Sequence, residues 1–222
     1  MISLFDPRLR SIPVVETGEP FVDLGAAGMP VLADHQRIGV SNPSVHFLKV
    51  REGVAQRLFE AAQRLPPGLH LLIKEGYRPL ALQRVYFARR VARLRELHPS
   101  APEAQLQELA AHYAAPPEVA AHPTGAAVDL TLATADGREL AMGSPVNAND
   151  ELSSGSCYTA SEFVGREARA NRDLLIAVMA QAGFVNYPSE WWHWSYGDRY
   201  WAVAMGQPHA LYGPTEESAL ET

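Results

Sequence analysis

The segment His122-Pro-Thr-Gly-Ala-Ala-Val-Asp-Leu-Thr-Leu132 decides how this chain is interpreted. Residues 127–133 alternate between two faces, and one face carries only the aliphatic side chains Val128, Leu130 and Leu132. This alternation predicts a β-strand that packs its aliphatic face into a core and directs Asp129 to the other side. A turn at Gly125 can bring the imidazole of His122 back beside that carboxylate. The segment therefore predicts a strand with two polar groups placed together at its start.

A second short segment, Glu190-Trp-Trp-His193, adds another imidazole and another carboxylate. Glu190 and His193 are three residues apart, so they would face opposite sides of a flat strand. We therefore expect a bulge or a helical turn near Pro188-Ser189 that directs both side chains to one site. Two imidazoles, one carboxylate and an open fourth position are typical of a catalytic zinc site. A nearby glutamate can serve such a site as a base.

The rest of the chain predicts an α+β fold, a small antiparallel sheet with helices packed against it. Helical periodicity covers 50–65, 79–97, 100–114 and 162–182, and strand-like runs cover 69–74, 184–187 and 191–196. The turn signal Asp136-Gly137 favours a return strand after the first segment. We interpret 1–222 as one domain, with residues 1–48 as an irregular N-terminal wrap and 213–222 as a frayed acidic tail.

Composition excludes several classes of function. The chain has 222 residues and a formal net charge of -6, which gives no electrostatic case for nucleic acid or an anionic membrane. No apolar run approaches the roughly 20 residues that span a bilayer. The first residues lack a basic segment followed by an apolar one, so we expect a cytoplasmic protein. Cys157 is the only cysteine, and no internal disulfide is possible.

Arg78, in the segment Glu75-Gly-Tyr-Arg-Pro79, completes the set of chemically active candidates. Attack of hydroxide on a carbonyl group places negative charge on the carbonyl oxygen. A permanently charged guanidinium with a rigid fork of donors suits that oxygen. Loss of one such donor typically lowers the rate about 10²- to 10³-fold.

Taken together, these segments resemble the VanX-type D-alanyl-D-alanine dipeptidases, zinc D,D-peptidases that share a fold with the Hedgehog signalling domain. The resemblance runs in order from Phe47 to Trp194 and includes Met142-Gly-Ser144. It implies one zinc ion per chain and hydrolysis of a small dipeptide, D-Ala-D-Ala above all. The zinc ligands that it implies are His122, Asp129 and His193, with Glu190 as general base and acid and Arg78 as the group that stabilises the transition state. We also expect Asn147 and Tyr77 to contact the substrate.

The chain departs from the family pattern around the substrate. Where these dipeptidases carry Phe-Asp after Met-Gly-Ser, this chain has Val146-Asn147, which removes a negative charge. Asp150 and Glu151 are nearby acids that could replace it. Ala120 stands where a serine is usual, and residues 34–41 do not match the family's N-terminal motif.

These departures keep alternative functions open. A zinc D,D-carboxypeptidase or a peptidase for other short peptides would use the same metal site. A catalytically silent zinc-binding module would have no use for both Glu190 and Arg78. The chain has no Gly-x-Ser-x-Gly segment around Cys157, which argues against a serine or cysteine hydrolase. The same ligands would also accept cobalt or nickel.

Overall fold

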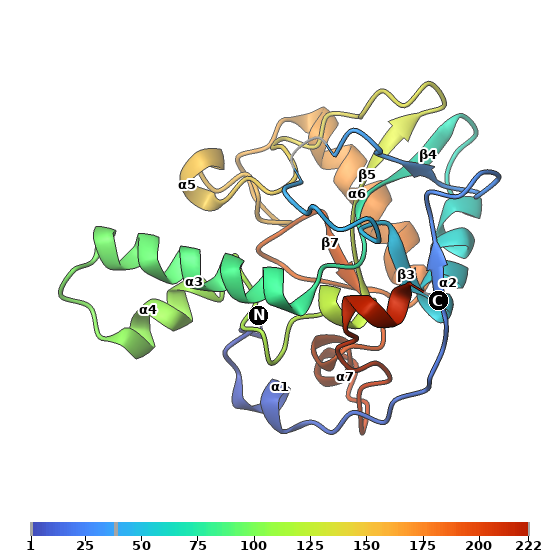
Figure 1. Ribbon diagram of the computed structural model, residues 1–222. Helices are drawn as coiled ribbons and strands as arrows, with labels where there is room; N and C mark the ends of the chain where they lie inside the picture. Colours follow the sequence, from blue (N-terminus) through green and yellow to red (C-terminus); the bar gives the residue numbers. More distant parts are fainter. Residues whose placement is uncertain (1, 38–39, 222) are drawn as a thin grey trace.

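The computed structural model describes residues 2–37 and 40–221. Within these residues the strands form a five-stranded sheet in the order β2-β4-β5-β7-β6 and a separate antiparallel pair, β1 and β3. The strands are β1 (Phe21–Asp23), β2 (Leu32–Ala33), β3 (Lys49–Arg51), β4 (Leu69–Glu75), β5 (Ala127–Thr134), β6 (Val185–Asn186) and β7 (His193–Ser195). Every pairing is antiparallel except that of β2 with β4. The predicted α+β fold is confirmed (Figure 1).

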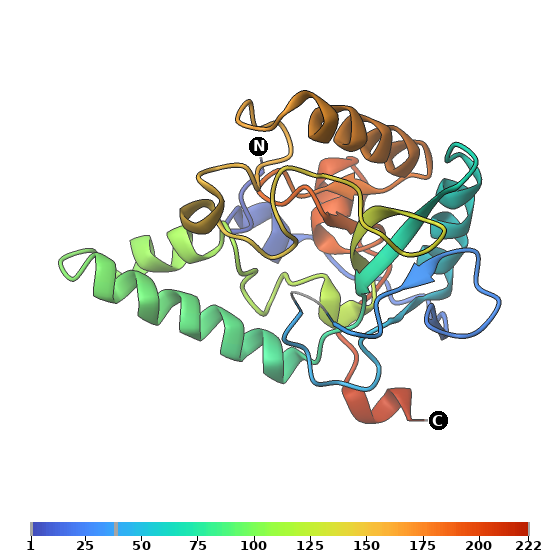
Figure 2. The same ribbon diagram turned by 90° about the horizontal axis from the view of Figure 1, so that it is seen from above.

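The four predicted helices are present as α2 (Glu52–Gln63), α3 (Leu80–Leu97), α4 (Glu103–Ala110) and α6 (Arg166–Gln181), each shorter than its sequence pattern. The structure adds the short helices α1 (Pro7–Ser11), α5 (Asp150–Ser153) and α7 (Arg199–Ala204), with 3₁₀ turns η1 (His122–Thr124) and η2 (Glu217–Leu220). Helices α2 and α6 contact each other and the strands. Helices α3 and α4 form a hairpin that projects from the body (Figures 1 and 2). None of the helices in the described ranges is long and apolar enough to cross a membrane.

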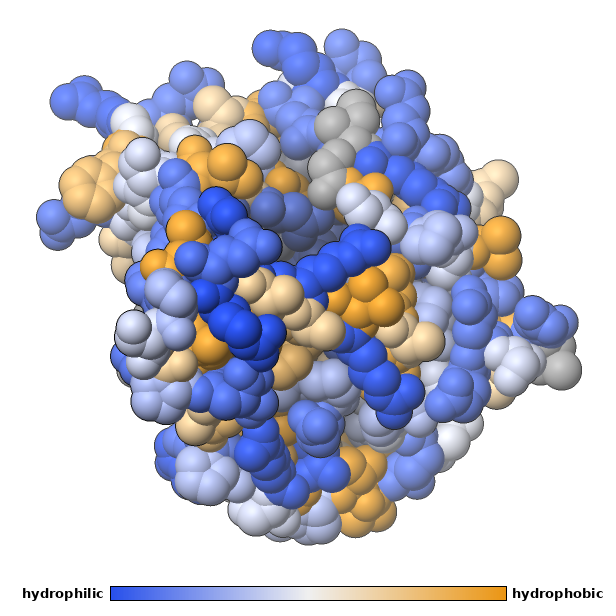
Figure 3. Space-filling model, turned by 60° about the vertical axis from the view of Figure 1, so that its left-hand side comes forward, coloured by the Kyte–Doolittle hydropathy of each residue, from blue (hydrophilic) through white to orange (hydrophobic). Residues whose placement is uncertain are grey.

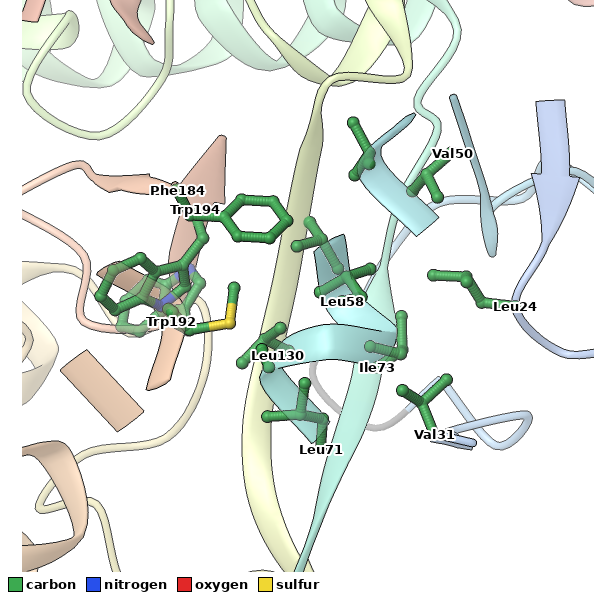
Figure 4. Packing of buried hydrophobic residues seen from close by; sticks show 14 of the residues in the cluster. Leu24, Val31, Val50, Leu58, Leu71, Ile73, Leu130, Phe184, Trp192 and Trp194 are labelled. Atoms are coloured by element: carbon green, nitrogen blue, oxygen red, sulfur yellow. The ribbon is translucent and has the colours of Figure 1, made fainter. Parts of the chain in front are cut away.

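Strand β5 lies at the centre of the hydrophobic core. Its aliphatic face is fully buried among residues of α2, β4 and the tryptophan segment, as Figure 4 shows for Leu58, Ile73 and Trp194. Each such side chain contributes roughly 1.5–3 kcal/mol through burial. The opposite face of β5 is buried too, so Asp129 is only 2% exposed. A carboxylate in such a place requires partners.

Two sequence expectations about chain ends and turns need correction. Asp136-Gly137 does make a turn, but the return strand is reduced to one bridge between Ala133 and Glu139. Residues 213–221 are tied down rather than frayed. Tyr77 Oη donates to the carbonyl of Thr215 over 2.8 Å, and Lys49 Nζ donates to the carbonyl of Leu220 over 2.8 Å. Leu220 is itself buried, which explains why an acidic segment stays on the body.

Candidate active site

The backbone fixes the orientation of His122. Its Nδ1 lies 2.6 Å from the carbonyl oxygen of Gly76, which leaves the lone pair on Nε2. The turn that follows ends at Gly125 with φ +73°, and a Cβ there would lie 2.3 Å from the Phe21 ring. Only glycine fits this position, because it adopts a positive φ without strain and has no Cβ to meet the ring. The expected turn at Gly125 is confirmed, and it places His122 Nε2 3.4 Å from Oδ1 of Asp129.

Strand register brings Asp129 and His193 together. The two residues are direct partners in the β5–β7 pair, and His193 Nδ1 lies 3.0 Å from Asp129 Oδ1. Burial alone would raise the pKa of Asp129, but His122 and His193 outweigh this effect and lower the pKa. One ligand atom from each of these three residues lies within 4.8 Å of the others. The structure therefore assembles the three predicted ligands into one candidate metal site.

Glu190 reaches the same site through two consecutive turns. Its N–H donates to the carbonyl of Tyr187 over 2.9 Å, and the N–H of His193 donates to the carbonyl of Glu190 over 3.2 Å. Asn186 fixes this loop, because its Nδ2 donates to the carbonyl oxygens of Glu190 and His193. The irregularity expected near Pro188-Ser189 is confirmed, as turns rather than as a bulge. Glu190 Oε2 thereby comes within 4.0 Å of His193 Nδ1.

The environment of Glu190 suits proton transfer. Burial is the largest effect on its carboxyl and raises the pKa, His193 and Arg78 lower it, and Asp129 raises it; together these effects bring the pKa to about 7. A carboxyl with a pKa near neutrality can both accept and return a proton at physiological pH.

Arg78 is anchored by three residues for which no role was predicted. Its Nε and Nη2 donate to the two carboxylate oxygens of Glu75 over 2.9 and 2.6 Å, and its Nη1 donates to Gln83 Oε1 over 2.9 Å. Asn42 Nδ2 donates to Glu75 Oε1 over 2.8 Å. A register shift between Ile73 and Glu75 in β4 places Glu75 opposite Asp129. The feature of the sequence that could have indicated this anchor is the acidic residue Glu75, three positions before Arg78.

The guanidinium of Arg78 lies near Asp129, one of the candidate metal ligands, and remains charged. Burial would lower the pKa of Arg78, but Glu75 and Asp129 outweigh burial and raise it. Arg78 Nη2 lies 3.9 Å from Asp129 Oδ2. The side chain is thus a fixed cation beside the carboxylate of the candidate metal site.

A single cavity of about 350 Å³ joins these groups. Its walls include all five candidate metal-binding and catalytic residues, together with Asn147 and Ala120. The face of the molecule that carries α3 and α5 is hollowed between mostly hydrophilic side chains (Figure 3). Tyr77, expected as a substrate contact, does not line the cavity, because its fully buried ring points to Thr215. Four other tyrosines line it instead: Tyr86, Tyr113, Tyr187 and Tyr200.

One feature of this site specifically favours a metal. Among the described residues, His122 Nε2 is buried and has no hydrogen-bond partner. A buried nitrogen lone pair without a partner is costly unless a cation occupies it. With a carboxyl of raised pKa and a guanidinium on the same cavity, the arrangement defines a metal-dependent hydrolase.

Comparison with known proteins identifies the family. Residues 42–210 match the family described as D-ala-D-ala dipeptidase, peptidase family M15. A D-alanyl-D-alanine dipeptidase of Synechocystis sp. is 31% identical over 96% of this chain and 99% of its own length. The chain therefore belongs to the M15 D-ala-D-ala dipeptidase family and is a metallopeptidase.

Other similarities are shorter or weaker. A D-alanyl-D-alanine dipeptidase of Escherichia coli is 40% identical over 32% of this chain and 35% of its own length. A solved structure of the D,D-pentapeptidase VanY, in complex with Zn(II), covers 96% of this chain and 99% of that chain at 17% identity and a TM-score of 0.42.

Proposed function

We propose that this protein hydrolyses D-alanyl-D-alanine to two molecules of D-alanine with zinc as its resident metal. The observation that carries the proposal is the convergence of His122, Asp129, His193, Glu190 and Arg78 on one cavity. Family membership supports the substrate. Because this dipeptide is a building block of bacterial peptidoglycan, we further propose a role in cell-wall metabolism.

The donor set fits zinc. Two imidazole nitrogens and a carboxylate oxygen are common ligands of catalytic zinc, and the unpartnered Nε2 of His122 is suited to one coordination bond. The Gly76 carbonyl holds the opposite nitrogen of that ring and so fixes the tautomer. Zinc, when bound, supplies a Lewis acid that polarises oxygen and makes a water more acidic.

Glu190 and Arg78 then divide the work of peptide hydrolysis. Glu190 takes a proton from the attacking water as the new C–O bond forms at the peptide carbonyl. Arg78 donates hydrogen bonds to the carbonyl oxygen as negative charge develops there. Glu190 returns the proton to the leaving nitrogen as the C–N bond breaks.

A second candidate, a carboxypeptidase for N-acylated or longer peptides, rests on Asn147. This residue lines the cavity and carries no charge. A carboxylate at this position would attract a free ammonium group on the substrate, and the neutral amide does not. The substrate then has no need of a free ammonium group. The two activities would therefore share the metal site and differ in the substrate's amino end.

Hydrolysis assays on two substrates test both candidates. Purified zinc-loaded protein would be given D-Ala-D-Ala and, separately, N-acetyl-D-Ala-D-Ala, with release of free D-alanine as the readout. Turnover of the first alone, abolished in Glu190→Gln, is the expected result. Turnover confined to the acetylated peptide would replace the dipeptidase with the carboxypeptidase. Turnover of D-Ala-D-Ala that survives Glu190→Gln would contradict the mechanism.

A further inference from the structure

One face of helix α3 extends the cavity away from the metal site. Gln83, Tyr86, Arg89 and Arg90 line the cavity, and their spacing of three and four residues places them on one helical face. Gln83 contacts Arg78, and the Tyr86 ring lies 5.1 Å from the Arg78 guanidinium. Arg89 comes one turn further along. It is exposed, and nothing in the described part of the chain forms a hydrogen bond or an ion pair with it.

Arg90 forms ion pairs with the two acidic residues of helix α5, Asp150 and Glu151. Its Nη2 lies 3.1 Å from Glu151 Oε1 and 3.9 Å from Asp150 Oδ1, and its guanidinium lies 5.0 Å from the centre of the Tyr113 ring. Neither acid lines the cavity. Asp150 and Glu151, considered above as replacements for a negative charge at position 147, are therefore engaged by Arg90.

Because Asp150 and Glu151 pair with Arg90, Arg89 is the cation at the outer end of the cavity that no acid among the described residues neutralises. Besides Arg89 this end presents the neutral side chains of Asn147, Asn149, Tyr86 and Tyr113. Arg90 Nε is buried there, without a hydrogen-bond partner among the described residues. This composition disfavours a substrate ammonium and favours a carboxylate, which an arginine fork binds with two donors.

Spacing relates this end to the scissile bond. Arg89 follows Gln83 by six residues, so it lies about 9 Å further along the axis of helix α3. A dipeptide substrate in an extended conformation spans about 7 Å, which is a similar length. We propose that Arg89, with Arg90 beside it, binds a carboxylate of the substrate at the outer end of the cavity. This group is either the terminal carboxylate of the dipeptide or the side-chain carboxylate of an acidic second residue. The inference rests on the proposed peptidase function and narrows its substrate class.

Binding measurements on a non-hydrolysing background test the inference. The zinc-loaded Glu190→Gln protein would be titrated calorimetrically with D-Ala-D-Ala, D-Ala-D-alaninamide and D-Ala-D-Glu. Arg89→Gln would be added to this background, and Arg84→Gln would serve as the matched control. Arg84 lies on the same helix, is also exposed and has no partner in the described ranges, but it does not line the cavity.

We expect Arg89→Gln to weaken binding of a carboxylate probe roughly 5- to 10-fold, as for a solvated charge-assisted hydrogen bond. Arg84→Gln should change it less than twofold, and added salt should reduce the difference. An effect on D-Ala-D-Ala that is absent with the amide assigns the terminal carboxylate. An effect on D-Ala-D-Glu alone assigns the side chain.

The inference is overturned if the two variants behave alike with every probe, or if no carboxylate probe binds the parent protein. Its failure is distinguishable from failure of the proposed function. Turnover of D-Ala-D-Ala by the wild-type protein, with equal behaviour of the two arginine variants, removes only the inference. Arg89-dependent binding without turnover by the wild type removes only the proposed activity.

Discussion

Replacing Arg78 with glutamine should damage both stability and catalysis, and the two effects can be separated. Glu75 is 1% exposed, and Arg78 provides two of its hydrogen bonds. Removal of one partner from such a buried pair typically costs 3–5 kcal/mol, so Tm should fall by roughly 6–20 °C for a domain of this size. Loss of the oxyanion donor should lower kcat about 10²- to 10³-fold.

The double variant Glu75→Gln/Arg78→Gln isolates the catalytic part. Removing both charges leaves no unpaired buried ion, and Asn42 can still donate to the amide oxygen at position 75. Thermal unfolding of the zinc-loaded proteins should therefore show most of the lost stability restored. Steady-state hydrolysis of D-Ala-D-Ala should stay as slow as in Arg78→Gln. Recovery of kcat together with Tm would refute a direct role for Arg78 in the reaction.

Three further predictions concern the metal site and its base. Glu190→Gln should lower kcat about 10²- to 10⁴-fold, and metal analysis should still find one zinc per chain. Loss of zinc in this variant would indicate that Glu190 is a metal ligand instead of a base. Gly125→Ala should lower Tm and zinc content, since the left-handed conformation costs about 1–2 kcal/mol and the new Cβ meets Phe21. Gly137→Ala, also at positive φ but with open space around its Cβ, should show only the conformational cost. Removal of the metal by chelation should abolish hydrolysis and lower Tm, because a ligand that binds the folded state stabilises it. Added zinc should restore both activity and Tm. Unchanged activity after verified metal removal would exclude a metal mechanism.

Local patterns predicted strands β4 to β7 and the residues of the candidate metal site, but the return strand expected after Asp136-Gly137 was wrong. The alternation in 127–133 depends on neighbouring residues only, and it placed β5 correctly. The spacing of Glu190 and His193 required an irregular backbone between them, which could be anticipated from geometry alone. Glycine at position 125 likewise indicated the turn that returns His122 to Asp129.

The parts that could not be predicted depend on contacts between distant segments. Asn42 lies 33 positions before Glu75, and no periodicity connects them. Tyr77 directs its hydroxyl group to Thr215 rather than to the cavity, and the sequence separation is 138 residues. The pairing of the α5 acids with Arg90 also joins distant segments, so the charge of the outer cavity could not be derived from composition.

The hydrogen bonds that tie the C-terminal segment, residues 215–220, to the body have a consequence for the order of folding. Ser44 donates a hydrogen bond to Glu217, Lys49 donates to the carbonyl of Leu220, and the N–H of Thr215 donates to the carbonyl of Pro123, next to the candidate metal ligand His122. Contacts across some 170 residues carry a large loop-closure cost and tend to form late. We therefore expect the central strands to form first and the loops around Arg78 and His122 to order only when the C-terminal segment docks on the body. Metal uptake would then report on the final step of folding.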